Sequence, residues 1–368
     1  MRCMLFIISV LSIFLFPNEL VAKRTSEPQF KQRILFEKRI NQPAICYRIP
    51  SLVTAQNGDL IAAVDQRYNT CGDLNINDNI NIVIRRSVDN GKSWLPIETI
   101  VDYPQGESAS DPSMLVDQFS GEILMFYNYM DLQNEKNVYC FKVIKSSDNG
   151  KSWSRPIDIT DQVTKPEWHN DMKFITSGRG SQTKSGRLLH TIVNLKRGLF
   201  VFGSDDHGKT WFLNETAIKP ADESIIVELS DGTWMINSRV QNAGVRYVHV
   251  SSDEGKTWFS QPDSTLLDPA CNASFVRYNS RKKTRNKNLL LFSNANSKTE
   301  RKNITLRSSI DEGKTWSKGV TIYNGNAAYS SLTILKNGDI GLLYEKNNYN
   351  EIVFVTIPYK LLIKTKSK

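Results

Sequence analysis

The chain has 368 residues, of which 23% are charged and 40% hydrophobic, and its formal net charge is +9. This length is ample for one large folded domain and does not imply a scaffold held together by disulfides. The positive charge is dispersed and no recognised nucleic-acid-binding motif is present, so we exclude a nucleic-acid partner and expect attraction to anionic ligands instead.

The N-terminus has the pattern of a secretory signal peptide. Met1-Arg2 is followed by an apolar run over residues 4–16, and Leu20-Val-Ala22 precedes two basic residues. We expect cleavage after about Ala22, so that residues 1–22 are the signal peptide and residues 23–368 the mature chain. The apolar run is too short for a comfortable membrane span. The sequence therefore predicts an exported protein, periplasmic or extracellular, with a retained N-terminal anchor as the alternative.

Short apolar runs bounded by Gly, Asn, Asp and Pro recur from residue 33 to residue 357, and long helical periodicity is absent. Such runs indicate β-strands. Turn dipeptides precede several of them: Asn57-Gly58, Ser120-Gly121, Ser185-Gly186, Asp231-Gly232 and Asn337-Gly338. The fold is therefore predicted to be all-β, with hairpins at these turns.

The tract Ser-x-Asp-x-Gly-x-Ser/Thr-Trp, called the Asp box below, occurs five times. The copies span residues 87–94, 146–153, 204–211, 251–258 and 309–316, and successive tryptophans lie 59, 58, 47 and 58 positions apart. The glycine permits a positive φ, and the Asp and Ser side chains can bond nearby backbone N–H groups. Because each copy follows a strand-like run, the box is predicted to be a stabilising hairpin turn without a catalytic role.

A tract that recurs in this way predicts one structural unit built several times. Five glycine turns and a further hairpin at Arg281–Lys287 give six units, of which five carry a box. The unit without a box, around residues 330–357, is expected to close the ring with residues 33–36. Four-stranded units with one aromatic turn each fit a six-bladed β-propeller, and no linker interrupts residues 23–368, so we expect a single domain.

Four cysteines remain in the predicted mature chain: Cys46, Cys71, Cys140 and Cys271. Neither they nor the four histidines have metal-ligand spacing, so we expect no metal and no organic cofactor. Buried free thiols are the default expectation, with a bridge between Cys46 and Cys71 as the alternative.

Three arginines, Arg48, Arg246 and Arg301, stand where strands of the expected units open toward a shared centre. Each taken alone would be interpreted as an ordinary surface cation. Together they could converge on one carboxylate, which guanidinium groups bind with planar and often bidentate geometry.

Tyr47-Arg-Ile-Pro50, Asn237-Ser-Arg239 and Ala328-Tyr-Ser-Ser331, together with five Asp boxes, resemble the bacterial exo-sialidases (neuraminidases) over nearly the whole predicted mature chain. The resemblance implies that Arg48, Arg246 and Arg301 hold the carboxylate of sialic acid. It implies catalytic roles for Tyr329 as nucleophile, for Glu228 as its base partner (alternative Glu223) and for Asp73 as acid/base (alternative Asp78). It further implies that Glu345 steadies Arg48, and that Asp111 and Arg67 line the pocket.

The resemblance implies an exo-α-sialidase, a retaining glycoside hydrolase that releases terminal sialic acid from glycoproteins or glycolipids. We expect the exported protein to be a monomer. A tyrosine nucleophile suits this substrate because the carboxylate on its anomeric carbon would repel an anionic nucleophile. Two alternatives stay open. One is a trans-sialidase, in which an acceptor sugar outcompetes water, and the other is a non-catalytic carbohydrate-binding propeller.

Overall fold

A computed structural model describes residues 30–41, 45–278 and 289–363 of the chain. The predicted signal peptide, the predicted hairpin loop at Arg281–Lys287 and the last residues of the tail lie outside the described residues. Within them, the only helices are α1 (Thr160–Val163), the 3₁₀ turn η1 (Pro166–Trp168) and α2 (Lys360–Ile363). No helix in the described part of the chain is long and apolar enough to cross a membrane. The remaining elements are strands, which confirms the all-β class.

The first four strand groups follow one another along the chain. The first group is β2 (Ile45–Thr54), β3 (Leu60–Tyr68), β4 (Ile80–Ser87) and β5 (Glu98–Val101). The second is β6 (Glu107–Val116), β7 (Ile123–Asp131), β8 (Cys140–Ser146) and β9 (Ile157–Asp158), with β11 (Gly178–Arg179) added parallel to β6. The third is β10 (Lys173–Ile175), β13 (Leu188–Asn194), β14 (Gly198–Ser204) and β15 (Phe212–Leu213), with β12 (Ser181–Gln182) beside β13. The fourth is β16 (Ser224–Glu228), β17 (Trp234–Ser238), β18 (Val245–Ser251) and β19 (Phe259–Leu267).

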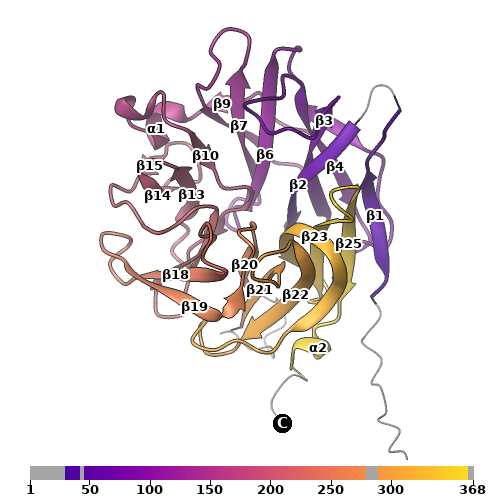
Figure 1. Ribbon diagram of the computed structural model, residues 1–368, viewed down its shortest axis with the longest axis vertical. Coiled ribbons are helices and arrows are strands. Elements are labelled where there is room, and N and C mark those ends of the chain that lie inside the picture. Colours follow the sequence, from indigo (N-terminus) through magenta and orange to yellow (C-terminus); the bar gives the residue numbers. More distant parts are fainter. Residues whose placement is uncertain (1–29, 42–44, 279–288, 364–368) are drawn as a thin grey trace, which may run out of the picture.

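A single seven-stranded sheet holds the last two groups. Its order is β1-β25-β24-β23-β22-β21-β20, formed by β20 (Ser274–Arg277), β21 (Leu290–Ala295), β22 (Lys302–Ser309), β23 (Val320–Ile334), β24 (Ile340–Lys346), β25 (Glu351–Ile357) and β1 (Gln32–Glu37). The long strand β23 pairs with β22 through its first half and with β24 through its second half. β23 therefore belongs to both the fifth and the sixth group, and Figure 1 shows the groups arranged around a common centre.

The N-terminal strand completes the sixth group, as the sequence predicted. β1 pairs antiparallel with β25, with Gln32 opposite Val355 and Phe36 opposite Ile352. The first strand of the chain thus becomes the outermost strand of the group formed by its end. Segments that are far apart in the sequence lie side by side here, at the right of Figure 1.

Each Asp box joins the third and fourth strands of a group and carries the same four hydrogen bonds. In the first box, Ser87 Oγ donates to Asp89 Oδ1 (2.8 Å) and accepts from Gly91 N (2.8 Å). Asp89 also accepts from Ser93 N at 2.9 Å and from Ser93 Oγ at 2.6 Å. The bonds from Ser93 lower the pKa of Asp89 to about 2. Equivalent bonds occur at Asp148, Asp206, Asp253 and Asp311.

Each box glycine lies against the strand group that precedes its own. A Cβ atom at Gly150 would lie 2.9 Å from Ile61, and one at Gly208 would lie 2.6 Å from Leu124. The first box follows the same rule across the chain ends, because a Cβ at Gly91 would lie 2.3 Å from Phe354 in β25. Glycine is therefore required at this position for two reasons: the backbone has a positive φ, and the neighbouring strand group leaves no room for a Cβ atom.

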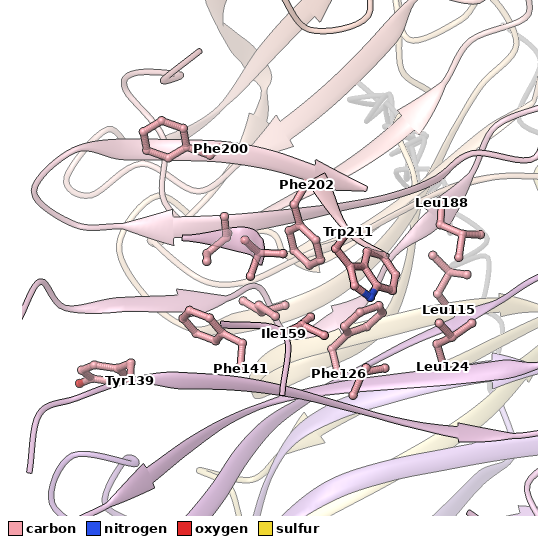
Figure 2. Packing of buried hydrophobic residues seen from close by; sticks show 14 of the residues in the cluster. Leu115, Leu124, Phe126, Tyr139, Phe141, Ile159, Leu188, Phe200, Phe202 and Trp211 are labelled. Carbon is pink, nitrogen blue, oxygen red and sulfur yellow. The ribbon is translucent and has the colours of Figure 1, made fainter. Parts of the chain in front are cut away.

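The hydrophobic core lies between neighbouring groups. In the cluster of Figure 2, Phe126 of β7 meets Phe202 of β14 and Trp211 of the third box, with ring centroids 5.8 Å and 5.1 Å apart. Leu74, from the loop after β3, is buried in the same cluster. The core thus fixes adjacent groups to one another and also fixes a loop that reaches the candidate site.

The close approach of the box glycine predicts a measurable stability difference between two Gly→Ala variants. Gly208 and Gly232 both have positive φ, at 79° and 92°, but a Cβ at Gly232 would meet nothing within 4 Å. Gly232→Ala should cost about 1 kcal/mol of unfolding free energy, from backbone strain alone. Gly208→Ala should cost about 1–3 kcal/mol more, because its methyl group overpacks against Leu124. Denaturant unfolding measures both, and equal losses would contradict the packing role.

Candidate active site

Tyr329 lies in the middle of β23, where the ladder with β24 shifts register between Ala327 and Ser330. Its side chain is buried, and its hydroxyl donates to Glu223 Oε2 at 2.7 Å. Arg239 Nη1 lies 3.1 Å from the same hydroxyl and 2.5 Å from Glu223 Oε2. A phenol, a carboxylate and a guanidinium from two strand groups therefore meet at one point.

The structure corrects the predicted partner of Tyr329. Glu228 is half-buried at the last position of β16, where its carboxylate accepts from Lys184 N at 2.7 Å. Glu223 directly precedes β16, so the two glutamates stand at opposite ends of a five-residue strand, with their Cα atoms roughly 17 Å apart. The Asp231-Gly232 turn was a usable signal, because it places Glu228 at the closed end of the β16–β17 hairpin.

Burial and neighbouring charges shift the pKa values of both Tyr329 and Glu223. Burial and the negative charge of Glu223 raise the pKa of Tyr329 well above its usual value, so the phenol is neutral near pH 7. Burial also raises the pKa of Glu223, while the charge of Arg239 opposes that shift. A neutral phenol bonded to a carboxylate of raised pKa is the arrangement of a nucleophile beside its general base.

The arginines around Tyr329 are Arg48, Arg239 and Arg301. The guanidinium carbons of Arg48 and Arg301 lie 5.8 Å and 5.5 Å from the centre of the Tyr329 ring. Arg301 donates to Ala270 O at 3.0 Å. Because three guanidinium groups approach one ring, the site is suited to hold a carboxylate next to the phenol.

Arg246, predicted as the third arginine, lies elsewhere. It is 1% exposed and uses its donors internally, on Asn237 Oδ1 (2.7 Å), Cys271 O (2.9 Å) and Asp268 Oδ2 (3.4 Å). It sits within β18, with the ring centre of Phe292 of the fifth group 5.8 Å away. Arg239 takes its place because it follows the end of β17 and its backbone N–H bonds Glu223 O. The signal was present in the motif Asn237-Ser-Arg239.

Glu345 contacts Arg48, as predicted, and also accepts hydrogen bonds from two backbone N–H groups. It is completely buried in β24, and its Oε1 accepts from Arg48 Nε at 2.7 Å and from Ile49 N at 3.0 Å. Its Oε2 accepts from Tyr329 N at 3.1 Å. One carboxylate thus connects β2, β23 and β24.

Tyr349 is a site residue that the sequence did not indicate. Its ring centre lies 3.9 Å from the Arg48 guanidinium carbon, and its hydroxyl accepts from Arg301 Nη1 at 3.1 Å. Asn347, Asn348 and Tyr349 all have positive φ, at 52°, 53° and 66°. That conformation is unusual for tyrosine. Nothing in the local sequence pattern predicts this backbone conformation, which places the Tyr349 side chain between Arg48 and Arg301.

Asp73 lies on the loop between β3 and β4, beside Arg67. Arg67 Nη1 donates to Asp73 Oδ1 at 2.7 Å, and the Asp73 side chain is 75% exposed. Its surroundings desolvate Asp73, which raises its pKa, but the charge and hydrogen bond of Arg67, with the charges of Arg48 and Arg301, outweigh this and lower the pKa. Asp78, the alternative, is exposed and contributes its backbone oxygen to Gly106 N.

Arg67 also joins Asp73 to two further acidic residues, buried Asp65 and half-buried Asp111. Its Nε and Nη2 donate to Asp65 Oδ2 at 3.0 Å and 2.8 Å, and Asp65 Oδ1 accepts from Asp111 N at 2.9 Å. Asn128 Nδ2 donates to Asp111 Oδ2 at 2.9 Å. Burial and the charge of Asp65 raise the pKa of Asp111 to about 8, so Asp111 takes up a proton at a higher pH than an ordinary carboxyl. A neutral carboxyl can both donate and accept hydrogen bonds to a polar ligand.

The Cys46–Cys71 alternative is the one observed, because these two cysteines form a disulfide. Cys140 is half-buried and Cys271 is buried, and both are free thiols. Among residues 30–41, 45–278 and 289–363, no group of three or more His, Cys, Asp or Glu side chains is placed to hold a metal ion.

Comparison with known proteins shows which family the chain belongs to. Residues 74–342 match the family model described as BNR repeat-like domain. A sialidase of Micromonospora viridifaciens is 36% identical over 327 residues, which is 81% of this chain and 50% of that protein. A sialidase of Bacteroides fragilis (strain YCH46) is 30% identical over 352 residues, which is 86% of this chain and 63% of that protein.

Among solved structures, the Hadza microbial sialidase Hz136 superimposes with a TM-score of 0.78 and 30% identity, over 86% of this chain and 66% of that one. The chain thus spans from half to about two thirds of the length of these three proteins. The matches nevertheless cover most of its own length. The chain therefore belongs to the BNR repeat-like domain family and, within it, to the bacterial sialidases.

Proposed function

We propose that this protein is an exo-α-sialidase that hydrolyses terminal sialic acid from glycoconjugates with retention of configuration. The observation that carries the proposal is the bond from the Tyr329 hydroxyl to buried Glu223, with Arg239 on both groups. The names of the relatives support the same substrate class.

Tyr329 is the proposed nucleophile and Glu223 its base. Because the anomeric carbon of sialic acid carries a carboxylate, a neutral phenol approaches it without the repulsion that a carboxylate nucleophile would meet. A phenol whose pKa is raised cannot attack unaided. Glu223, already bonded to the hydroxyl, takes the proton as the bond to carbon forms and so becomes neutral. Arg239, bonded to both groups, stabilises the partial negative charge that the phenol oxygen carries during the attack.

Arg48, Arg239 and Arg301 are the proposed carboxylate-binding arginines. Glu345 and Tyr349 support two of them, since Glu345 bonds Arg48 while Tyr349 stacks on Arg48 and bonds Arg301. Held in this way, the guanidinium groups lose little freedom when the substrate binds. They also stabilise the oxocarbenium-like transition state from fixed positions.

Asp73 is the proposed acid/base. It is exposed toward solvent and held by Arg67, so a leaving oxygen and later a water molecule can reach it. Arginine charge lowers its pKa in the free protein. When the substrate carboxylate neutralises part of that charge, the pKa of Asp73 rises and the proton needed by the leaving oxygen becomes available.

The architecture that goes with this function is a single six-bladed β-propeller domain over residues 23–368. Support comes from the six strand groups, from β1 completing the sixth and from the first box glycine lying against Phe354 of that group. Export after removal of residues 1–22 belongs to the same proposal. The Cys46–Cys71 disulfide supports export, because disulfides persist in oxidising compartments.

The test of the proposal compares the wild-type protein with Tyr329→Phe on 3′-sialyllactose. The wild type should release free sialic acid whose α-anomer appears first by NMR. Tyr329→Phe should lose at least about 100-fold in kcat, because no nucleophile replaces the phenol. Tyr344→Phe is the matched control. Tyr344 is buried in the neighbouring strand, and its hydroxyl has no hydrogen-bond partner among the residues that the structure describes, so removing the hydroxyl should leave activity near wild type.

The products of the same reaction distinguish the two alternative functions, a trans-sialidase and a non-catalytic binding protein. Sialic acid transferred to added lactose, or released as an anhydro sugar, would assign a trans-sialidase. Retention on a sialoside column without turnover would assign a non-catalytic binding protein. Full activity in Tyr329→Phe would contradict the mechanism.

The choice of base predicts opposite results for two glutamates in one hairpin. Glu223→Gln keeps the shape but cannot take the phenol proton, so kcat should fall by about 100-fold or more. Glu228→Gln replaces the carboxylate that accepts from Lys184 N and should leave kcat near wild type. Steady-state kinetics on one sialoside compares the two, and a loss confined to Glu228→Gln would restore Glu228 as the partner.

A further inference from the structure

We infer that the Cys46–Cys71 disulfide positions the proposed acid/base Asp73, so that it serves leaving-group protonation as well as stability. This inference rests on the proposed function and concerns one step of it. Cys46 and Cys71 would be positioning residues, because they act through the loop that carries Asp73.

The disulfide joins the two segments that the reaction must hold in register. Cys46 lies in β2, two residues before Arg48, and Cys71 lies two residues before Asp73. The two segments differ in how well the fold alone would hold them. Arg48 lies in a long buried strand, whereas Asp73 lies in the loop between β3 and β4. The bond therefore fixes the start of the acid-bearing loop to the strand that binds the substrate carboxylate.

Arg67 holds the same short stretch from inside. It faces Cys46 across the β2–β3 ladder, and its Nη1 donates to Cys71 O (2.8 Å), Gly72 O (3.2 Å) and Asp73 Oδ1 (2.7 Å). One guanidinium nitrogen thus serves three successive residues. Such a shared bond orients Asp73 only while Cys71 and Gly72 stay in place.

The other end of the stretch has its own anchor. Leu74 is buried in the cluster between the second and third groups, and Asn77 O accepts from Ser108 Oγ at 2.8 Å. Only Gly72 and Asp73 lie between the disulfide and Leu74. Within the loop, Asp73 O also accepts from Ile76 N and Asn77 N. Loss of the disulfide should therefore loosen the stretch from Cys71 to Asp73 at its start, while the later part of the loop and the fold remain.

Freedom at Asp73 has a specific chemical consequence. A general acid must lie within hydrogen-bond reach of the leaving oxygen, and a misplacement of about 1 Å can cost about 100-fold. A sugar alkoxide leaves only when it is protonated, whereas an acidic phenol leaves readily without a proton. A displaced Asp73 should therefore slow natural substrates far more than aryl sialosides.

The experiment compares kcat/KM for 3′-sialyllactose and for 4-methylumbelliferyl sialoside in the Cys46→Ser/Cys71→Ser double variant. The ratio kcat/KM reports the steps up to departure of the leaving group, so later hydrolysis of the intermediate does not enter. We expect a fall of about 10–100-fold for sialyllactose and less than about threefold for the aryl sialoside. Cys140→Ser, which removes a free thiol, should change neither.

A second experiment keeps the test valid if the double variant folds poorly. Wild-type protein treated with dithiothreitol should show the same selective loss of activity on sialyllactose, and reoxidation should restore it. Equal losses on both substrates would reduce the disulfide to a structural role, and no loss on either would overturn the inference outright. Failure of the proposed function looks different, because the untreated wild-type protein would then cleave neither substrate.

Discussion

The site depends on one buried carboxylate, that of Glu345, which ties the beginning of the described chain to its end. It bonds Arg48 Nε and Ile49 N in β2 through one oxygen and Tyr329 N in β23 through the other. An unpaired charge in that position would be strongly destabilising, whereas here three donors satisfy it. The carboxylate therefore sets the separation of Arg48 and Tyr329 and ties the first strand group to the last two.

Charge is divided between two halves of the site. Around Tyr329, arginines dominate, and the phenol stays neutral because burial and Glu223 raise its pKa. Around Asp111, acids dominate, and one of two neighbouring carboxyls takes up a proton because burial and Asp65 raise the pKa of Asp111 to about 8. Arg67 lies between the halves, bonded to both Asp65 and Asp73. A ligand with a carboxylate at one end and hydroxyl groups at the other matches this division.

The five Asp boxes made the all-β class and the order of the strand groups predictable. The unit that lacks a box made part of the site predictable. The boxes marked the turns, and the unit without a box contained Tyr329 and Glu345. The errors at Glu228 and Arg246 share one cause. Distance along the sequence does not tell which end of a short strand, or which face of it, reaches the centre. The hairpin turn at Asp231-Gly232 held the answer for Glu228, but Tyr349 had no such marker because its position follows from backbone conformation alone.

In the proposed reaction, Tyr329 attacks the anomeric carbon while Glu223 takes the proton of its hydroxyl. The most direct measurement is mass spectrometry of the protein after reaction with a sialosyl fluoride that also carries fluorine at C3, which slows breakdown of the covalent intermediate. We expect one added sialosyl group on the peptide that contains Tyr329, and none in Tyr329→Phe. A group found on the peptide that carries Glu223 or Asp73, or turnover of the reagent without any adduct, would contradict it.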